Sequence, residues 1–333
     1  MKELTWKQLG MMTVLSILLW GVLYYPLDYY IQMPGEALDV RSVVTVPDAD
    51  EDDEGSFLLT VVLGRQANIP AYVWALMQPD YAIYPLEEVI PAEMDDAEYH
   101  ELMLSSMAQS QDIAAALALR HYGYAVEEHG EGALVVAVSD TSTAKESIAP
   151  GDIIVRLDDT DVQFSTSLTN ALLHRVPGEM VSLVLDRDGE KIPLSVELSP
   201  KESDPAVGAI GVACVTYNWF MDFALDIDIN TNNIGGSSAG LMMTLEMMNQ
   251  LDPSDITGGY CIAGTGTVDL QGNVGAIGGV QQKVIGATRT GAQYFLVPLE
   301  NAAEAREVAS SAITLVEVAT VGDALEFLAT LQP

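Results

Sequence analysis

Apolar residues are gathered into one long uncharged run near the N-terminus, before any shorter pattern begins. Residues 9–27 (LGMMTVLSILLWGVLYYPL) contain no charged side chain. About 20 apolar residues in helical form are enough to cross the hydrocarbon core of a bilayer, and aromatic residues at one end are typical of the membrane–water interface. The pattern predicts a tail and a transmembrane anchor within residues 1–31, and no later segment is apolar enough to span.

The charges around this run predict its orientation. Lys2 and Lys7 precede it, whereas Asp28, Glu36 and Asp39 follow it. Because positive residues stay preferentially in the cytoplasm, we expect a single-pass protein of the cell membrane, with a cytoplasmic N-terminus and extracytoplasmic domains. A cleaved signal peptide is the alternative, but the bulky residues that follow the run offer no small-residue cleavage site.

Shorter patterns after the anchor predict strands and one long helix. RSVVTV (41–46) and FLLTVVL (57–63) are rich in apolar and β-branched residues and are predicted to be strands. The acidic stretch DADEDDEG (48–55) between them is predicted to be a solvated turn. Over residues 91–120, apolar residues return every three or four positions, which predicts a helix whose methionines face the core.

A distinct unit of short strands is predicted over residues 122–200. ALVVAV (133–138) is predicted to be a strand, and PGDIIVRLDDTDV (150–162) a strand followed by a turn. Residues 165–175 are predicted to form a helix, and MVSLVLDRDGEKIPLSVEL (180–198) a hairpin around Asp188-Gly189. This order, together with Gly151-Asp152 before alternating apolar residues, resembles a PDZ domain.

The resemblance to PDZ domains implies a peptide-binding site. A PDZ domain adds a chain terminus or an extended segment as a strand, and backbone N–H groups capture its carboxylate. The matching loop here would be formed by Tyr122, Gly123, Tyr124 and Ala125. A glycine beside aromatic residues is equally typical of an ordinary turn, so both interpretations stay open.

The charge balance excludes one large class of partners. The chain has 333 residues, with 48 Asp and Glu against 14 Lys and Arg, and its formal net charge is −34. Nucleic-acid binding needs a basic surface that replaces counterions on phosphates, so we expect no nucleic-acid partner. The surplus of carboxylates is expected to keep the surface soluble.

The two cysteines do not predict a metal site. Cys214 and Cys261 lie in separate apolar runs and lack the spacing of metal ligands. We expect two buried thiols, with a single disulfide as the alternative. No metal and no cofactor are predicted.

Chemistry is predicted in the last third of the chain. FALDIDIN (223–230) alternates as a strand does, and NIGGSSAGLMMTLEMMNQ (233–250) is a glycine-rich turn that opens into a helix. Ser238 lies at the start of this helix, where free N–H groups and the positive end of the helix dipole favour a developing oxyanion. Taken alone, the fragment is better explained by a serine that only caps a helix.

A serine hydroxyl needs a base to become a nucleophile, and few candidates exist. No histidine follows His174, and Lys283 is the only lysine in the last third of the chain. Its neighbours are Gly, Val, Ile, Ala and Gln, and no acidic residue lies between Asp269 and Glu300. Because poor solvation of an ammonium lowers its pKa, we expect a neutral Lys283 amine that can act as the base.

Two segments carry a closer resemblance. IGGSSAGLMMTLEMM and IAGTGTVDLQGNVGAIGGVQQKVIGATRTGAQYFLVPLEN resemble the proteolytic domain of Lon, peptidase family S16, over about residues 223–305. The resemblance implies that Ser238 is the nucleophile and that Lys283 is the base. It also implies that Thr265 supports the lysine by hydrogen bonding.

The resemblance extends to the fold and the order of domains. It implies an α+β fold, in which a Lon-type proteolytic domain (ribosomal protein S5 domain 2-like) is joined to a PDZ domain. The anchor and the segment MPGEALDV narrow it to YlbL-like membrane proteases. We expect the first part of the Lon-like domain at 41–121, the PDZ domain at 122–200 and the catalytic domain at 201–333, so that the PDZ domain is inserted into the catalytic one.

Two departures from the family pattern lie in the glycine-rich turn around Ser238 (residues 233–239), which we call the serine loop. Ser237 stands where most Lon-like sites have proline, and it is the less favoured candidate for the nucleophile. Gly235 stands where full-length Lon has an acidic residue, so control of activity through that carboxylate is in doubt. No G-x-x-x-x-G-K-[ST] sequence occurs, so we expect no ATP-binding module.

These expectations combine into one function. The alkoxide of the serine would attack a peptide carbonyl, and the backbone around Gly236, Ser237 and Ala239 would hold the oxyanion. We expect an ATP-independent serine endopeptidase that cleaves extracytoplasmic or membrane-proximal proteins, with the PDZ domain helping to recognise protein or peptide substrates. An inactive PDZ and Lon-like scaffold and a self-processing protein are the alternatives, and assembly as a homo-oligomer stays open.

Overall fold

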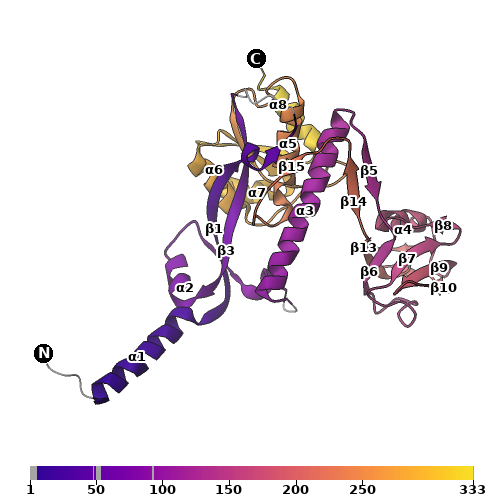
Figure 1. Cartoon of the computed structure of the whole chain (residues 1–333), viewed down its shortest axis with the longest axis horizontal. Helices are drawn as coiled ribbons and strands as arrows, with labels where there is room; N and C mark the ends of the chain where they lie inside the picture. Colours follow the sequence, from indigo (N-terminus) through magenta and orange to yellow (C-terminus); the bar gives the residue numbers. More distant parts are fainter. Residues whose placement is uncertain (1–5, 48, 50–53, 92–93, 333) are drawn as a thin grey trace. The chain divides into compact units, whose positions relative to one another are not determined.

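The computed structural model describes residues 6–47, 49, 54–91 and 94–332, and it forms two compact units (Figure 1). The first unit combines Met1–Ala125 with Leu225–Pro333, and the second comprises Val126–Ala224. Most of the acidic turn predicted at 48–55, and Lys2 in the predicted tail, lie outside the described residues.

The first unit begins with helix α1 (Trp6–Tyr24), which leads directly into strand β1 (Pro26–Asp39). By its length and composition, α1 is the one helix among the described residues that is able to cross a membrane, and none of its apolar window is buried in the protein. The position of α1 agrees with the run that the sequence analysis singled out.

A six-stranded sheet organises the rest of the first unit, in the order β20-β19-β16-β3-β1-β4. The partners of β1 are, in chain order, β3 (Ser56–Asn68), β4 (Ala82–Pro85), β16 (Cys261–Gly264), β19 (Tyr294–Pro298) and β20 (Thr314–Val318). Strands β3, β16, β19 and β20 pair in parallel, whereas β1 pairs antiparallel with β3 and with β4. The long strand β3 therefore joins the parallel half of the sheet to the antiparallel half.

Helices cover both faces of the sheet because side chains alternate between the faces along each strand. On one face, Leu58 and Phe295 pack in a buried cluster with α6 (Val280–Thr290) and α7 (Ala302–Val308). On the other face, Gly264 lies against the sulfur of Met242 in α5 (Gly240–Leu251), where a Cβ atom would collide with it. Since the sheet is buried on both sides, its central strands are continuous apolar runs.

Two further helices complete the first unit. Helix α3 (Asp96–His121) starts with a capping box formed by Asp95 and Glu98, five residues after the predicted start at residue 91. It packs against α5. Helix α8 (Val321–Ala329) follows the last strand and is also opened by a capping box.

The predictions of strands at 41–46 and 223–230 were only partly right. Residues Val40–Ser42 form a 3-10 turn, and the strand is limited to β2 (Val44–Thr45). The turn forms because the Asp39 side chain accepts the Arg41 N–H and pairs with its guanidinium. In the second segment only β15 (Asp228–Ile229) is a strand, together with the end of β14 (Phe220–Phe223).

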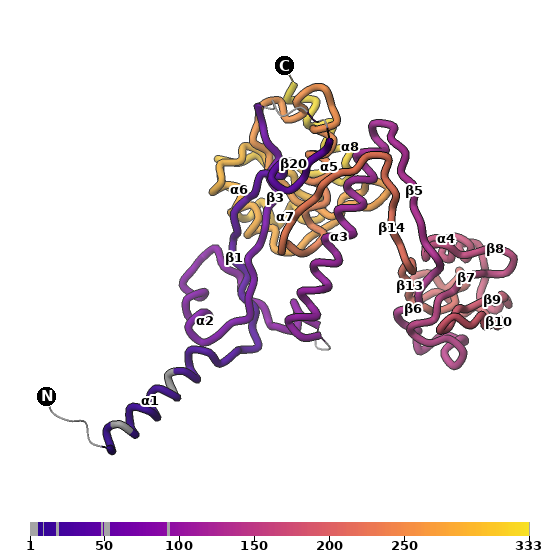
Figure 2. Tube along the Cα trace, viewed as in Figure 1, coloured from indigo at the N-terminus to yellow at the C-terminus, as the bar shows by residue number. Residues whose placement is uncertain are grey.

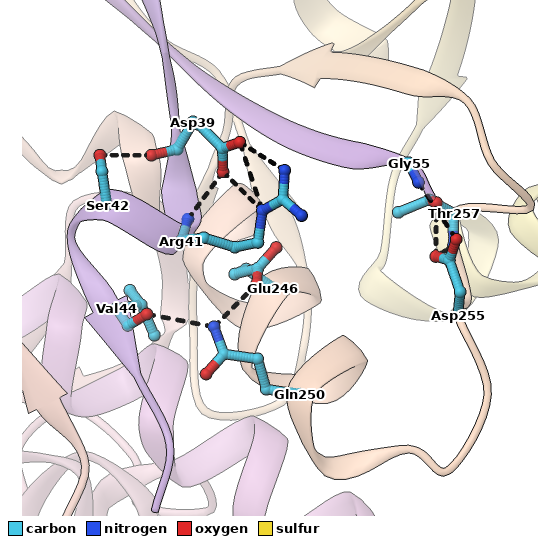
Figure 3. A network of polar contacts seen from close by, with 9 residues as sticks. All are labelled: Asp39, Arg41, Ser42, Val44, Gly55, Glu246, Gln250, Asp255 and Thr257. Carbon is cyan, nitrogen blue, oxygen red and sulfur yellow. Dashed lines mark hydrogen bonds and ion pairs between the residues drawn. The ribbon is translucent and has the colours of Figure 1, made fainter. Parts of the chain in front are cut away.

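A polar network ties this N-terminal turn to helix α5 (Figure 3). The Gln250 amide donates to the Glu246 carboxylate at 2.7 Å and to the Val44 carbonyl at 3.1 Å, and its oxygen accepts the Val46 N–H at 2.7 Å. Glu246 itself is fully buried. These bonds satisfy polar groups that would otherwise be costly inside the core, and they hold α5 in register with β2.

The second unit is built on a sheet in the order β10-β9-β7-β6-β13. Its elements are β6 (Ala133–Val138), β7 (Ile153–Leu157), β8 (Thr160–Asp161), α4 (Ser165–Leu172), β9 (Met180–Arg187), β10 (Glu190–Glu197), β11 (Ser199–Lys201), β12 (Asp204–Ala209) and β13 (Val212–Thr216). The predicted hairpin around Asp188 and Gly189 is confirmed, and both residues have positive φ, of 53° and 86°.

The second unit extends beyond residue 200, where the PDZ domain was predicted to end. Strand β13 pairs with β6, and β14 pairs with β5 (Val126–His129), so the chain enters and leaves the unit as two adjacent strands (Figure 2). This arrangement makes the first unit discontinuous in sequence, as an inserted domain does. Residues 201–224 were expected in the catalytic domain, because the resemblance to PDZ domains ended at the hairpin, but they belong to the second unit.

The cysteines are free thiols in different units, so no disulfide joins them. Both are half-buried rather than fully buried as expected. Burial raises the pKa of the Cys214 thiol to about 11, which keeps that thiol protonated and unreactive at neutral pH.

The packing of α6 against β1 predicts the effect of one glycine substitution. A Cβ atom at Gly286 would collide with the Gly35 carbonyl oxygen, whereas one at Gly322 in α8 would meet its nearest neighbour, the Thr320 hydroxyl, at 3.4 Å. We expect Gly286→Ala to lower the free energy of unfolding by about 1–3 kcal/mol through overpacking. The control Gly322→Ala should raise it by up to about 1 kcal/mol, as alanine favours helix.

Denaturant unfolding of the full chain in detergent measures both changes. Equal stability of the two variants would contradict the close approach of α6 and β1.

Candidate active site

The serine loop is shaped by two glycines. Gly236 has φ +90°, a conformation that residues with a side chain rarely adopt. At Gly235, a Cβ atom would lie 2.7 Å from the Cβ of Met103 in α3, so a larger residue does not fit. The chain then forms a 3-10 turn at Ser237–Ala239 that continues into α5. The pair of glycines thus lets Ser238 open the helix close to α3.

Helix α3 holds this loop through two hydrogen bonds. The Gly236 N–H donates to the Met103 carbonyl at 2.7 Å, and the Ser110 hydroxyl donates to the Ser237 carbonyl at 3.0 Å. The Gly236 N–H is therefore already used, and it could serve an oxyanion only if the bond to Met103 broke. The first N–H groups of a helix have no partner within the helix, which leaves the turn that starts at Ser237 as the better source of donors.

The structure brings Ser238, Lys283 and Thr265 together from three elements. The Lys283 amine lies 2.6 Å from the Ser238 hydroxyl oxygen and 3.0 Å from the Thr265 hydroxyl oxygen. The Thr265 hydroxyl in turn donates to the Ser238 carbonyl at 3.0 Å. Ser238 lies in the 3-10 turn directly before α5, Lys283 lies in the first turn of α6, and Thr265 follows the carboxyl end of β16. The predicted constellation is thus assembled in space.

The environment of Lys283 favours the neutral amine. Its side chain is 4% exposed, and Thr265 is fully buried. Burial lowers the pKa of Lys283 from 10.5 to about 7, because the ammonium loses solvation. No ion pair of Lys283 is found among the described residues. Near pH 7 a large fraction of the amine is therefore unprotonated and able to accept a proton from Ser238.

An open groove of about 900 Å³ leads to this site. It is bounded by β3, by α3 and by the serine loop, with Ser238 and Lys283 in its wall. Strand β16 pairs with β3 only as far as Leu59, so from Thr60 onward this edge of β3 carries no partner among the described strands. An unpaired strand edge can bind an extended peptide through its backbone.

No group of His, Cys, Asp and Glu in the described part of the chain could hold a metal ion. The groups that the site offers for chemistry are an amine, two hydroxyls and the N–H groups of a helix start.

The predicted PDZ loop does not lie in the second unit, and this prediction is corrected. Tyr122, Gly123, Tyr124 and Ala125 end helix α3 in the first unit. The Tyr122 hydroxyl donates to Asp252 at 2.8 Å, and Gly123 has φ +80°, as in a helix-ending turn. The open alternative, an ordinary turn, was the right one.

The second unit has a groove that the sequence analysis missed. Its volume is about 550 Å³, and it lies between α4 and the strand β13. Strand β13 is at the edge of its sheet and follows the turn at Ile210-Gly211. Gly211 has φ +78°, and a Cβ atom there would lie 2.7 Å from Ser142. The glycine before an alternating run, in AIGVACV, was the signal available in the sequence.

Comparisons with known proteins match the two units. Residues 220–331 match the model of the Lon protease (S16) C-terminal proteolytic domain, and residues 121–198 match the PDZ domain model. The Lon protease of Neorickettsia sennetsu is 29% identical over 115 residues, which are 34% of this chain and 14% of that protein. The Lon protease of Clostridioides difficile is 38% identical over 73 residues, which are 22% of this chain and 9% of that protein.

The similarity is confined to single domains. The chain covers less than a fifth of the curated relatives' length, between 9% and 19% in these and in the Lon protease of Phenylobacterium zucineum. Among solved structures, the PDZ domain of the SdrC-like protein from Listeria monocytogenes is 19% identical, with a TM-score of 0.24, over 26% of this chain and 88% of that one. The predicted resemblances thus agree with the family models, a PDZ domain at residues 121–198 and a Lon-type proteolytic domain at residues 220–331.

The lowered pKa of Lys283 predicts how stability depends on pH. The unfolded chain, with a lysine pKa of 10.5, binds more protons than the folded one, with a pKa of about 7, so stability rises with pH between these values. At pH 7 the cost of burying the amine is on the order of a few kcal/mol. We expect Lys283→Met to raise the thermal midpoint at pH 7, and the gain should shrink toward pH 10.

The exposed Lys201 supplies the control, since Lys201→Met at the surface should leave the midpoint at pH 7 nearly unchanged. Thermal unfolding at several pH values measures the difference. Parallel curves for the wild type and Lys283→Met would show that the folded pKa is not lowered.

Proposed function

We propose that this chain, which carries a PDZ domain and a Lon-type proteolytic domain, is a membrane-anchored serine endopeptidase with Ser238 as nucleophile and Lys283 as base. The observation that carries the proposal is the 2.6 Å contact between the Lys283 amine and the Ser238 hydroxyl. The buried surroundings that lower the amine pKa to about 7 support the same roles.

The proposed reaction is acyl transfer. Neutral Lys283 takes the proton of the Ser238 hydroxyl while the oxygen attacks a peptide carbonyl carbon and forms a C–O bond. The Lys283 ammonium then donates a proton to the amide nitrogen, the C–N bond breaks, and the amine product leaves. Lys283 next takes a proton from water, whose oxygen attacks the ester and releases the carboxylic acid. The ammonium finally returns its proton to Ser238.

Two further groups support this chemistry. The N–H groups of Ser237 and Ala239, in the turn that opens α5, are the proposed donors to the oxyanion, where the positive end of the helix also favours negative charge. Thr265 accepts a hydrogen bond from Lys283 and donates one to the Ser238 carbonyl. It therefore positions the amine relative to the nucleophile without taking part in proton transfer.

The free edge of β3 is the proposed binding site for the scissile segment. A substrate strand added along Thr60–Gln66 would run through the groove past Ser238, since the same groove is lined by both. Backbone hydrogen bonds would supply affinity largely independent of sequence. The groove is lined by apolar residues such as Val62, Met103 and Ile234, which favour apolar side chains in the substrate.

The groove in the second unit supports assisted recognition of substrates. A chain terminus added along β13 would face α4, and the turn at Ile210-Gly211 would lie at its carboxylate. The unit would thus raise the local concentration of a bound chain near the protease.

Anchoring and independence from ATP complete the proposal. Helix α1 has the length and composition of a membrane span, and the charges around it favour an extracytoplasmic protease. Since the sequence contains no phosphate-binding loop motif, the proposed enzyme does not unfold substrates with ATP. Its substrates are accessible or flexible segments of extracytoplasmic or membrane-proximal proteins.

Substitution of the two reacting residues tests the proposed roles. We expect Ser238→Ala and Lys283→Met to lower cleavage of β-casein by about a thousandfold or more, as removal of either member of a catalytic pair does. Ser237→Ala is the matched control, because the neighbouring hydroxyl has no role in the reaction and should retain most activity.

Peptide release by the full chain in detergent is the readout, with intact mass of the purified protein to detect a single self-cleavage. Cleavage at the wild-type rate by both variants would refute the dyad, and loss of activity in Ser237→Ala alone would reassign the nucleophile.

The pKa of Lys283 predicts the pH profile of cleavage. Only the neutral amine can accept the serine proton, so kcat/KM should rise about tenfold per pH unit below the lysine pKa of about 7 and level off above it. Initial rates with a short fluorogenic peptide between pH 5 and pH 9 measure the profile. A flat profile through pH 7 would contradict Lys283 as the base.

A further inference from the structure

Helix α2 (Ile69–Ala75) packs its alanines and Tyr72 inward, whereas other large apolar side chains are exposed. Ala75 is 3% exposed and packs with Ile31 and Ala67 in a small core cluster. The exposed residues of α2 and of the two positions that follow it, which we call the α2 patch, have exposed fractions of 37% to 66%: Ile69, Val73, Trp74, Leu76 and Met77. A helix at a water-facing surface has the opposite distribution, and such a contiguous apolar patch marks a surface that is covered by a partner.

The pairing of β1 with β3 places the α2 patch at the end of α1. Helix α1 ends at Tyr24, and Pro26 is paired with Asn68 at the far end of β3. Asn68 is the N-cap of α2, where its side chain accepts the Ala71 N–H at 3.0 Å. Helices α1 and α2 are also in contact (Figure 1). The patch therefore lies where the chain leaves the proposed membrane span.

The chemistry of this region fits a lipid surface. Residues 69–79 contain no charge, although the chain as a whole has a net charge of −34. Aromatic rings gather beside the patch, with Tyr29 and Tyr72 at 4.9 Å between ring centroids and Tyr25 exposed at the end of α1. Tyr and Trp with apolar neighbours are typical of the headgroup level of a bilayer. In an acidic protein, an uncharged face is also the part that approaches anionic headgroups with the least electrostatic repulsion.

We propose that the α2 patch inserts into the interfacial layer of the bilayer beside α1, as a second membrane contact of the first unit. The inference rests on the proposed membrane anchor. Insertion of the α2 patch would limit how far from the membrane cleavage occurs. Strand β3 connects Asn68 to Thr60 at the groove, and eight steps along a strand cover roughly 27 Å. The groove border at Thr60 is therefore no farther than this from Asn68 beside the patch, within reach of polypeptides that are tethered to the same membrane.

Single-tryptophan variants of the full chain in lipid vesicles test the insertion of α2. The chain has four tryptophans, Trp6, Trp20, Trp74 and Trp219. Three variants keep only Trp20, only Trp74 or only Trp219, with phenylalanine at the other three positions. Fluorescence is compared in vesicles with and without lipids that carry a doxyl quencher near the headgroup.

We expect the lipid quencher to reduce emission from Trp74 to a similar extent as emission from Trp20. Quenching of Trp20 without quenching of Trp74 would overturn this inference and leave the anchor intact. Absence of quenching at Trp20 would overturn the proposed anchor as well. If neither the lipid quencher nor aqueous acrylamide reached Trp74, another copy of the chain would be its cover, and lipid insertion would be wrong.

A second measurement controls for variants in which the replacement of a tryptophan disturbs the fold. The Trp219 side chain donates to Glu128, so its replacement can disturb the second unit. The Trp74 signal is therefore also measured in a variant that retains Trp219, whose own contribution is known from the Trp219-only protein. The same quenching of Trp74 is expected in both backgrounds, and its disappearance when Trp219 is kept would overturn the insertion.

Discussion

The burial of the Lys283 amine beside the Ser238 hydroxyl is the interaction on which the rest of the structure depends. A lysine in water is protonated at neutral pH and cannot act as a base, whereas here lost solvation lowers its pKa to about 7. Burial of the amine requires that the surrounding elements pack closely. Gly286 allows this because, without a side chain, it lets α6 approach the backbone of β1. Thr265 and the Ser238 hydroxyl then satisfy the hydrogen-bonding groups of the amine without a counter-charge.

Sequence reasoning reached the site better than it reached the fold around it. The absence of histidine after residue 174 and the carboxylate-free stretch around Lys283 were physical signals of a neutral lysine, and they did not depend on long-range structure. Strand β1 was missed because Pro34 and Gly35 argue against a strand, and only its pairing with β3 across a register shift makes it one. The oxyanion donors could not be ranked, since the bond from Gly236 to Met103 is a tertiary contact.

The predicted peptide-binding loop shows how a local pattern can mislead. A glycine between tyrosines at 122–124 fits a peptide-binding loop, but tertiary contacts make it the end of α3, fixed by the bond from Tyr122 to Asp252. The less conspicuous Gly211 precedes the edge strand β13. In the first unit, by contrast, the single strand β3 links the core, the groove and helix α2. The buried end of β3 lies in the core, its middle borders the groove, and its last residue caps α2 beside the end of α1.

The protonation state of Lys283 is the central claim, and it can be measured directly. The chain has six lysines, so a pH titration followed by NMR of ¹⁵N-labelled lysine amines, with Lys283→Met to assign the signal, resolves the group of interest. We predict that the Lys283 amine titrates near pH 7, because burial lowers its pKa to about that value. A Lys283 amine that is still protonated well above pH 8 would contradict the proposed base.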